Sequence, residues 1–199
     1  TYDGGGYVIS NLVISSVDDE PTGLFNQTSE GTLIQNVSLT ELVVRGRSQV
    51  GGLVGQANDT TIRRIRASAD VEGAQAYIGG LVVSALIATI EDVVVQADVR
   101  STGTSDTDGY VGGVVGYAIL TNLRNLDVTS TVRTDGTAAG GVAGLLIASS
   151  MERADVDAVI RGKGDALGGA VGTLSTPSIL SETNVEILDV NVSVDMVVD

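Results

Sequence analysis

The chain has 199 residues, enough for one sizeable domain, and its 43% of apolar residues with 3% aromatics predicts a core of Val, Ile, Leu and Ala. Its formal charge of −14, from 25 acidic and 11 basic residues, excludes nucleic acid and anionic lipid as expected partners. Because Cys and His are both absent, thiolate nucleophiles, imidazole bases and the usual zinc sites are excluded too.

The basic residues are almost all Arg, and this composition is similar to that of proteins from extreme halophiles. A surface rich in carboxylates stays hydrated when salt screens its self-repulsion. An ordinary acidic secreted domain is the alternative. The longest apolar-rich run, residues 79–90, is too short to span a bilayer, so we expect no direct membrane insertion. The chain does not begin with Met and shows no signal peptide, and we expect a mature or excised piece of a longer protein.

In chain order, residues 1–21 are expected to form an N-terminal partial coil, 22–167 regular coils, and 168–199 the last coil and a C-terminal strand. A doublet of glycines followed by small apolar residues recurs through the two later parts, and its first copy, Thr22-Gly23, has one glycine only. The second glycine of each copy advances by 29, 28, 33, 28 and 28 residues. The glycines expected to form structural corners or to allow close approach of the next coil are Gly52, Gly55, Gly80, Gly113, Gly116, Gly141, Gly144, Gly169 and Gly172.

A second anchor of the form apolar-x-x-apolar-x-apolar keeps step with the glycines. Its first members lie 25, 28, 28, 33, 28 and 28 residues apart, so both series contain one five-residue insertion, assigned to residues 101–109. The first members are Ile9, Ile34, Ile62, Ile90, Leu123, Met151 and Ile179.

This period, with alternating apolar residues, predicts strands stacked in coils rather than helical repeats. We predict an all-β, right-handed parallel β-helix (a β-solenoid) of about six coils of ~28 residues, with three short strands per coil. The first strand contains the glycine segment, the second surrounds the anchor, and the third alternates. Four equivalent core positions of the third strand are Val71, Val99, Val132 and Ile160.

The glycine segments resemble the GLUG-motif repeat, best in Gly52-Leu53-Val54-Gly55 and Gly113-Val114-Val115-Gly116. The opening segment, residues 2–12, is also similar to the start of such arrays. Two copies depart from the motif, with Asn26 and Val83 at the closing glycine. The resemblance implies a β-solenoid of secreted and surface proteins of bacteria and archaea, adhesins among them, with no catalytic residues.

Outward positions should form ladders between coils. One ladder alternates in sign and is expected to fix the register: Arg63, Glu91, Arg124 and Glu152. A second ladder consists of positive charges only: Arg100, Arg133 and Arg161. Because stacked like charges repel, we expect an anionic group beside them, either carboxylates of the same chain, an anionic glycan or a partner surface.

Asp127 and Asp155 occupy equivalent positions, and a close carboxylate pair is the geometry of retaining glycoside hydrolysis. Solvated surface charge is the simpler interpretation, and no enzyme activity is expected. No cofactor is expected either. Calcium is a candidate ligand at Asp18-Asp19-Glu20 and at residues 106–109, where oxygen donors cluster. Four sequons, at Asn26, Asn36, Asn58 and Asn191, suggest N-glycosylation of an extracellular surface.

The ends of a solenoid expose unpaired strands, so we expect contacts there with other domains of the same protein or with other copies. The preferred function is a non-catalytic extracellular structural or adhesion module, such as a stalk, spacer or ligand-presenting segment. A filament or lattice subunit that stacks through its ends is the first alternative. A β-helix that binds or cleaves polysaccharide, including surface glycans, is the second.

Overall fold

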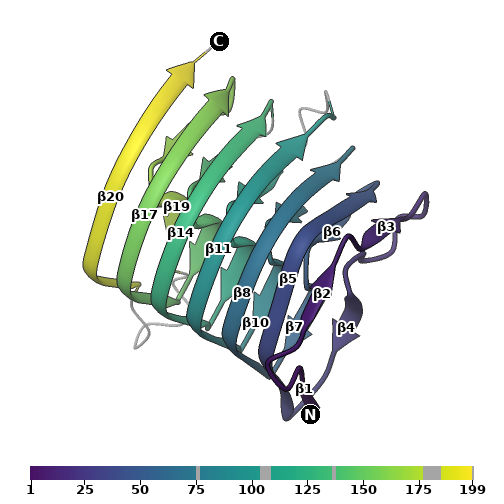
Figure 1. Cartoon of the computed structure of the whole chain (residues 1–199). Helices are drawn as coiled ribbons and strands as arrows, with labels where there is room; N and C mark the ends of the chain where they lie inside the picture. The colour runs from purple at the N-terminus through teal and green to yellow at the C-terminus, as the bar shows by residue number, and fades with distance from the viewer. Residues whose placement is uncertain (75–76, 104–108, 136–137, 177–184, 199) are drawn as a thin grey trace.

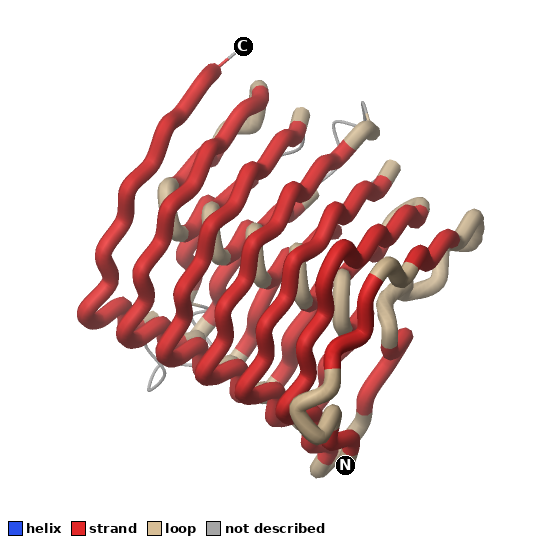
Figure 2. Tube along the Cα trace, in the orientation of Figure 1, coloured by secondary structure: helices blue, strands red, loops and turns tan. Residues whose placement is uncertain are grey.

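The computed structural model describes residues 1–74, 77–103, 109–135, 138–176 and 185–198, and every regular element in them is a β-strand. All strand pairings are parallel, and the strands stack into three sheets that run the length of the molecule (Figures 1 and 2). The chain is therefore a parallel β-solenoid, as predicted.

Each complete coil contributes one strand to each sheet. The first sheet holds the long strands β5 (Thr32–Gly46), β8 (Thr60–Gly73), β11 (Thr89–Ser101), β14 (Asn122–Thr134), β17 (Ser150–Gly162) and β20 (Glu186–Val198). The second holds β4 (Phe25–Thr28), β7 (Val54–Asn58), β10 (Val82–Leu86), β13 (Val115–Ile119), β16 (Ala143–Ile147) and β19 (Val171–Ser175). The third holds β6 (Gln49–Gly51), β9 (Tyr77–Gly79), β12 (Tyr110–Gly112), β15 (Ala138–Gly140) and β18 (Ala166–Gly168).

The strand register confirms the predicted equivalence between coils. Ile62 lies opposite Ile90, which lies opposite Leu123 in the next coil, and all three are fully buried. The four core positions of the predicted third strand pair in the same way and have no exposed surface: Val71, Val99, Val132 and Ile160. Stacking identical or similar apolar side chains fills the interior without aromatic residues.

The three strands of a coil are divided differently from the prediction. The anchor and the alternating segment belong to one long strand, whereas the glycine doublet separates two short strands, such as β9 and β10. Each long strand turns without ending because the residue at one equivalent position adopts positive φ, between 53° and 56°: Asn36, Arg64, Asp92, Asn125, Arg153 and Asp189. A further residue of β5, Glu41, has φ of 54° and lies at the register shift between β5 and β8. A second positive-φ residue precedes the long strand in four coils: Asp59, Ile87, Leu120 and Ala148. These bends were not predicted, although they fall within the apolar-x-x-apolar anchor, where two consecutive positions, both polar in β5 to β17, interrupt the period-2 alternation.

The predicted five-residue insertion is confirmed, because the connection from β11 to β12 has eight residues and that from β8 to β9 has three. The predicted alignment of the first and last coils with their neighbours was wrong. Ile9 was expected opposite Ile34, but Tyr2 pairs with Ile34 and Ile9 pairs with Leu39. A turn at Gly4–Gly6 offsets the first strands β1 (Tyr2–Asp3), β2 (Val8–Ser10) and β3 (Val13–Ser15) against β5.

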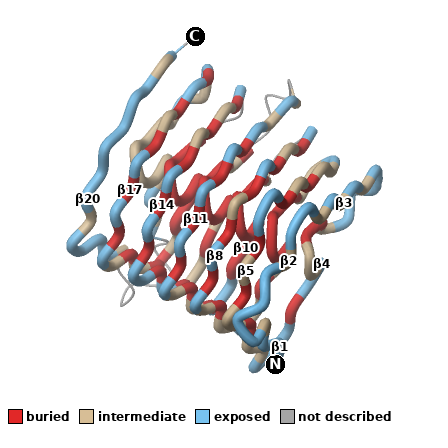
Figure 3. The backbone as a smooth tube through the Cα atoms, in the orientation of Figure 1, coloured by how far each residue is buried: buried red, intermediate tan, exposed pale blue. Residues whose placement is uncertain are grey.

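The last anchor was expected to open at Ile179, which lies outside the described residues. The residue opposite Met151 is Ile187, so the anchor of β20 starts there. Because β20 is the outermost long strand, its inward side chains have no further coil above them (Figure 3). Buried residues are frequent in the central coils, whereas the described residues of β18, β19 and β20 are intermediate or exposed.

Candidate functional site

The outer face of the long sheet carries the ladders that the sequence predicted, and it is the candidate functional surface. Along these strands buried and exposed residues alternate, so every second side chain points away from the core. Neighbouring coils place equivalent outward side chains opposite one another, about 4.8 Å apart. The surface is therefore made of parallel rows, each with its own chemistry.

The row at the bends of the long strands is a hydrogen-bonded polar ladder. The Asn125 amide donates to the Asp92 carboxylate at 2.8 Å, and the Arg153 guanidinium donates to the Asn125 oxygen at 2.7 Å. Near the N-terminus the Arg64 guanidinium donates to the Asn36 oxygen at 2.7 Å. Asn and Asp tolerate positive φ better than most residues. A polar residue inside each apolar-x-x-apolar anchor was the signal that could have revealed this ladder.

The N-terminal end of this ladder fixes one carboxylate. The Asn36 amide donates to Asp3 at 2.8 Å, and the Gly5 N–H and the Gln35 amide donate to it as well. These hydrogen bonds, with that of Asn36 first, lower the pKa of Asp3 from its ordinary value. Asp3 thereby ties β1 to the first complete coil.

The row of alternating sign is in register, with Glu91 opposite both Arg63 and Arg124, and Arg124 opposite Glu152. Only one of these neighbours forms an ion pair among the described residues, Arg124 with Glu152 at 3.6 Å. The Arg63 guanidinium instead donates to Gln35 at 2.9 and 3.0 Å.

The row of like charges is also in register: Arg100 lies opposite Arg133, which lies opposite Arg161. The sequence reasoning missed its continuation, because Glu72 lies opposite Arg100 and Arg45 lies opposite Glu72.

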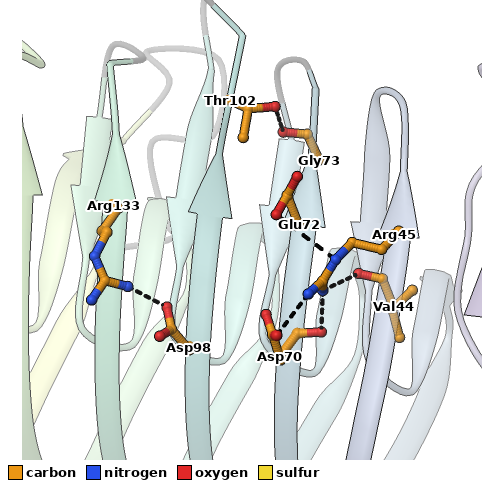
Figure 4. A network of polar contacts seen from close by, with 8 residues as sticks. All are labelled: Val44, Arg45, Asp70, Glu72, Gly73, Asp98, Thr102 and Arg133. Atoms are coloured by element: carbon orange, nitrogen blue, oxygen red, sulfur yellow. Dashed lines mark hydrogen bonds and ion pairs between the residues drawn. The ribbon is translucent and has the colours of Figure 1, made fainter. Parts of the chain in front are cut away.

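Carboxylates in the adjoining row bind two of these arginines (Figure 4). Arg133 pairs with Asp98 at 2.5 Å and Arg45 with Asp70 at 2.6 Å. The hydrogen bond with Asp70 raises the pKa of Arg45. These pairs run diagonally between coils, so sequence alignment of the coils does not reveal them.

A groove crosses the outer face of the central long strands. Two adjoining hollows, of about 340 and 450 Å³, share Ser68, Gln96 and Thr129. Asp70 and Asp98 border the first hollow, and Arg66 and Asp127 border the second. The surface therefore offers hydroxyl, amide and carboxylate groups in rows.

Asp127 and Asp155 lie opposite each other on β14 and β17, as the sequence alignment of coils predicted. Only Asp127 borders the groove; Asp155 accepts a 3.5 Å hydrogen bond from Asn191. Within the described residues no group of three or more acidic side chains is placed to hold a metal ion. Of the two calcium candidates, Asp19 pairs with Arg47 at 3.3 Å, and residues 106–108 lie outside the described residues.

The repeated glycines lie where neighbouring coils approach most closely. A Cβ on Gly52, Gly80 or Gly113 would overlap the carbonyl oxygen of the next doublet. The closing glycines are equally confined, because a Cβ on Gly116 would stand 2.7 Å from the Val83 oxygen. Both explanations offered by the sequence apply, because the doublets lie between strands of two sheets, such as β9 and β10, and also where neighbouring coils approach closely. Positive φ is not the reason for these glycines, since among the described glycines it occurs only at Gly5, Gly6 and Gly31.

The four sequons differ in accessibility. Asn26 on β4 and Asn191 on β20 are exposed, whereas Asn36 and Asn58 are partly buried. The Asn36 side chain already bonds Asp3 and Arg64, so a glycan there would disrupt the bend ladder.

Among the described residues, no helix has the length and apolar character to cross a membrane.

A search of protein families finds no match for the chain, so the resemblance to GLUG-motif repeats stays a prediction. No solved structure matches it either. A segment covering 40% of the chain is 37% identical, over 83 residues, to halomucin of Haloquadratum walsbyi. The matched segment is about 1% of the length of halomucin.

Proposed function

We propose that this chain is a non-catalytic extracellular module, a stalk, spacer or ligand-presenting segment of a cell-surface or envelope protein of a halophile. The observation that carries the proposal is the continuous stack of long strands from β5 to β20. Each long strand pairs in parallel with the next, in constant register from β8 onward and with one register shift in β5, between Leu39 and Leu42. Such stacks are quasi-one-dimensional and present long rows of outward side chains, which suits a spacer better than a compact catalytic domain.

Two further observations support the extracellular and halophilic parts of the proposal. A segment covering 40% of the chain is similar to part of a protein named halomucin, from Haloquadratum walsbyi. The charge of −14 with one Lys is the composition expected at high salt.

The location is tested on intact cells that produce the protein. Antibodies raised against residues 1–199 should label unpermeabilised cells or their shed envelope material, and external protease should remove the signal. Labelling that requires permeabilisation contradicts the proposal. The absence of catalysis is tested separately with a panel of acidic polysaccharides, in which reducing-sugar release sensitive to Asp127→Asn and Asp155→Asn would contradict it.

A second candidate function, end-to-end assembly, is favoured by the surface of β20. Ile187, Val192, Val194 and Met196 lie opposite buried core residues of β17 but are 38–42% exposed. They form an apolar strip beside the edge of β20 that pairs with no other strand of the described residues, and such edges invite pairing with another chain. We propose that the occupant is a second copy of the solenoid.

Light scattering after size-exclusion chromatography tests this assembly. The apparent mass should rise with protein concentration and with molar salt, which screens repulsion between acidic copies. Val194→Lys, which places a charge in the strip, should give a monomer. Ser193→Lys is the matched control, because Ser193 points outward from the same strand and should leave assembly intact. A strictly monomeric chain at all concentrations removes this candidate.

A further inference from the structure

Three arginines meet near the ends of β11, β14 and β17 on the outer surface. Arg100, Arg133 and Arg161 are direct neighbours in register. Neighbouring strands lie about 4.8 Å apart, so three positive charges stand in a short row. Like charges placed opposite each other destabilise a sheet unless an anion lies beside them.

The surrounding carboxylates leave this row partly uncompensated. Arg133 pairs with Asp98, but in the part of the chain that the structure describes Arg100 and Arg161 have no ion pair. Glu72, the residue opposite Arg100, lies 3.7 Å from Arg45 instead. Two of the three guanidinium groups are therefore available to a ligand.

The row opens onto a hollow of about 310 Å³. Its wall consists of the three arginines with Ser101, Thr134, Asp135 and Gly162. Asp135 is exposed and forms no ion pair with these arginines among the described contacts, so its carboxylate can accept hydrogen bonds from hydroxyl groups. Guanidinium groups bind carboxylate and sulfate as planar forks. The hollow thus combines anion donors with a hydroxyl acceptor.

We infer that this arginine pocket binds an acidic polysaccharide, with the carboxylates or sulfates of the sugar units along Arg100, Arg133 and Arg161 and sugar hydroxyls on Asp135. An acidic peptide fits less well, because side chains on one face of an extended peptide recur every ~6.7 Å against ~4.8 Å for the row. The inference rests on the geometry of these coils and stands whether or not the chain is a surface spacer.

The test is a calorimetric titration of the 199-residue chain at fixed ionic strength with hexagalacturonate and with a sulfated hexasaccharide. Methyl-esterified hexagalacturonate removes the charge while keeping the sugars, hexa-aspartate supplies charge without sugar, and sodium sulfate supplies a free anion. We expect either acidic oligosaccharide to bind tightly and the methyl ester to bind at least about tenfold more weakly, because the ester cannot form charge-assisted hydrogen bonds with the arginines.

Arg100→Gln/Arg161→Gln should weaken that binding by about tenfold or more. Arg47→Gln is the matched control for the single variant Arg161→Gln, because each removes one positive charge from an exposed arginine. Arg47 lies near the N-terminal end, so its loss should change affinity by less than about twofold. Thermal unfolding checks that each variant is folded, and Arg161→Gln alone serves if the double variant is not.

Four outcomes would overturn the inference. They are no binding of either acidic oligosaccharide, equal loss of affinity in Arg47→Gln, equal or tighter binding of hexa-aspartate, and binding of sulfate with no preference for the oligosaccharides. The last two would identify an acidic-peptide site and an adventitious ion only.

Discussion

Gly113 and Gly141 occupy the same position in successive coils, and a Cβ on Gly113 would overlap the carbonyl oxygen of Gly141. The repeated glycine is therefore required by the distance between coils and not by an unusual backbone angle. Its absence of a side chain lets two backbones approach within hydrogen-bonding range, as the 3.1 Å bond from the Gly113 N–H to the Gly140 oxygen shows.

Gly113→Ala should lower the free energy of unfolding by about 3 kcal/mol, because the added methyl group forces neighbouring backbones apart. Gly73→Ala is the control: its Cβ would meet chiefly the terminal methyl of Ile78, which can move, so a loss of about 1 kcal/mol is expected. Urea unfolding followed by circular dichroism measures both. Equal losses would show that close backbone approach is not what selects glycine.

At the bends, Asn125→Ala should destabilise the chain by about 1 kcal/mol more than Asn125→Gly, because alanine pays the cost of positive φ and glycine does not. Both variants lose the hydrogen bonds to Asp92 and Arg153, so their difference isolates the backbone term. Thermal unfolding of the pair measures it. An alanine variant as stable as the glycine variant would contradict the assignment.

The alternating ladder predicts one weak coupling. A double-mutant cycle of Arg124→Gln and Glu152→Gln should give a coupling free energy of about 0.5 kcal/mol between the two side chains at low salt. This coupling should fall toward zero in molar salt, which screens the ion pair. The same cycle on Arg63 and Glu91 is the control, because Arg63 bonds Gln35 instead, and it should give less. Similar couplings in both cycles would mean that register alone, rather than the ion pair, is being measured.

The net charge predicts a strong salt response. Raising potassium chloride from low to molar concentration should raise the unfolding temperature, because screening relieves repulsion among the 25 acidic side chains. Sucrose at matched water activity is the control for general solute effects. An unfolding temperature that does not change with salt would remove the halophile interpretation.

Asp3 predicts a local response to acid. The pKa of Asp3 is lowered in the folded chain. The ionised carboxylate therefore contributes fully to holding β1 on β5 above the ordinary pKa of 3.8, and this stabilisation is lost as pH falls through the lowered pKa. Nuclear magnetic resonance should therefore show β1 detaching from β5 only below pH 3.8. In Asp3→Asn this transition should disappear. Detachment near pH 5 would contradict the hydrogen-bonded geometry.

Much of the architecture was predictable because a solenoid repeats its own register. Once Ile62, Ile90, Leu123 and Met151 are aligned in sequence, the pairing of the rest of each long strand follows, including the Arg100–Arg133–Arg161 row. The prediction was wrong at the ends, where β1–β3 and β20 depart from the period. There the number of residues between paired positions differs from 28: Met151 and Ile187 are 36 residues apart, and Tyr2 and Ile34 are 32 apart.

The sequence by itself determined the coil period, the buried positions and the place of the insertion, since alternation and recurrence are properties of the residue order. Only the tertiary structure decided where the long strands bend, which arginines find carboxylates, and where the outer face is hollowed. The physical reason is that recurrence states which residues are equivalent between coils. The φ of a single residue such as Asn125, and the diagonal reach of a side chain such as Arg133 to Asp98, depend on the three-dimensional path of the chain.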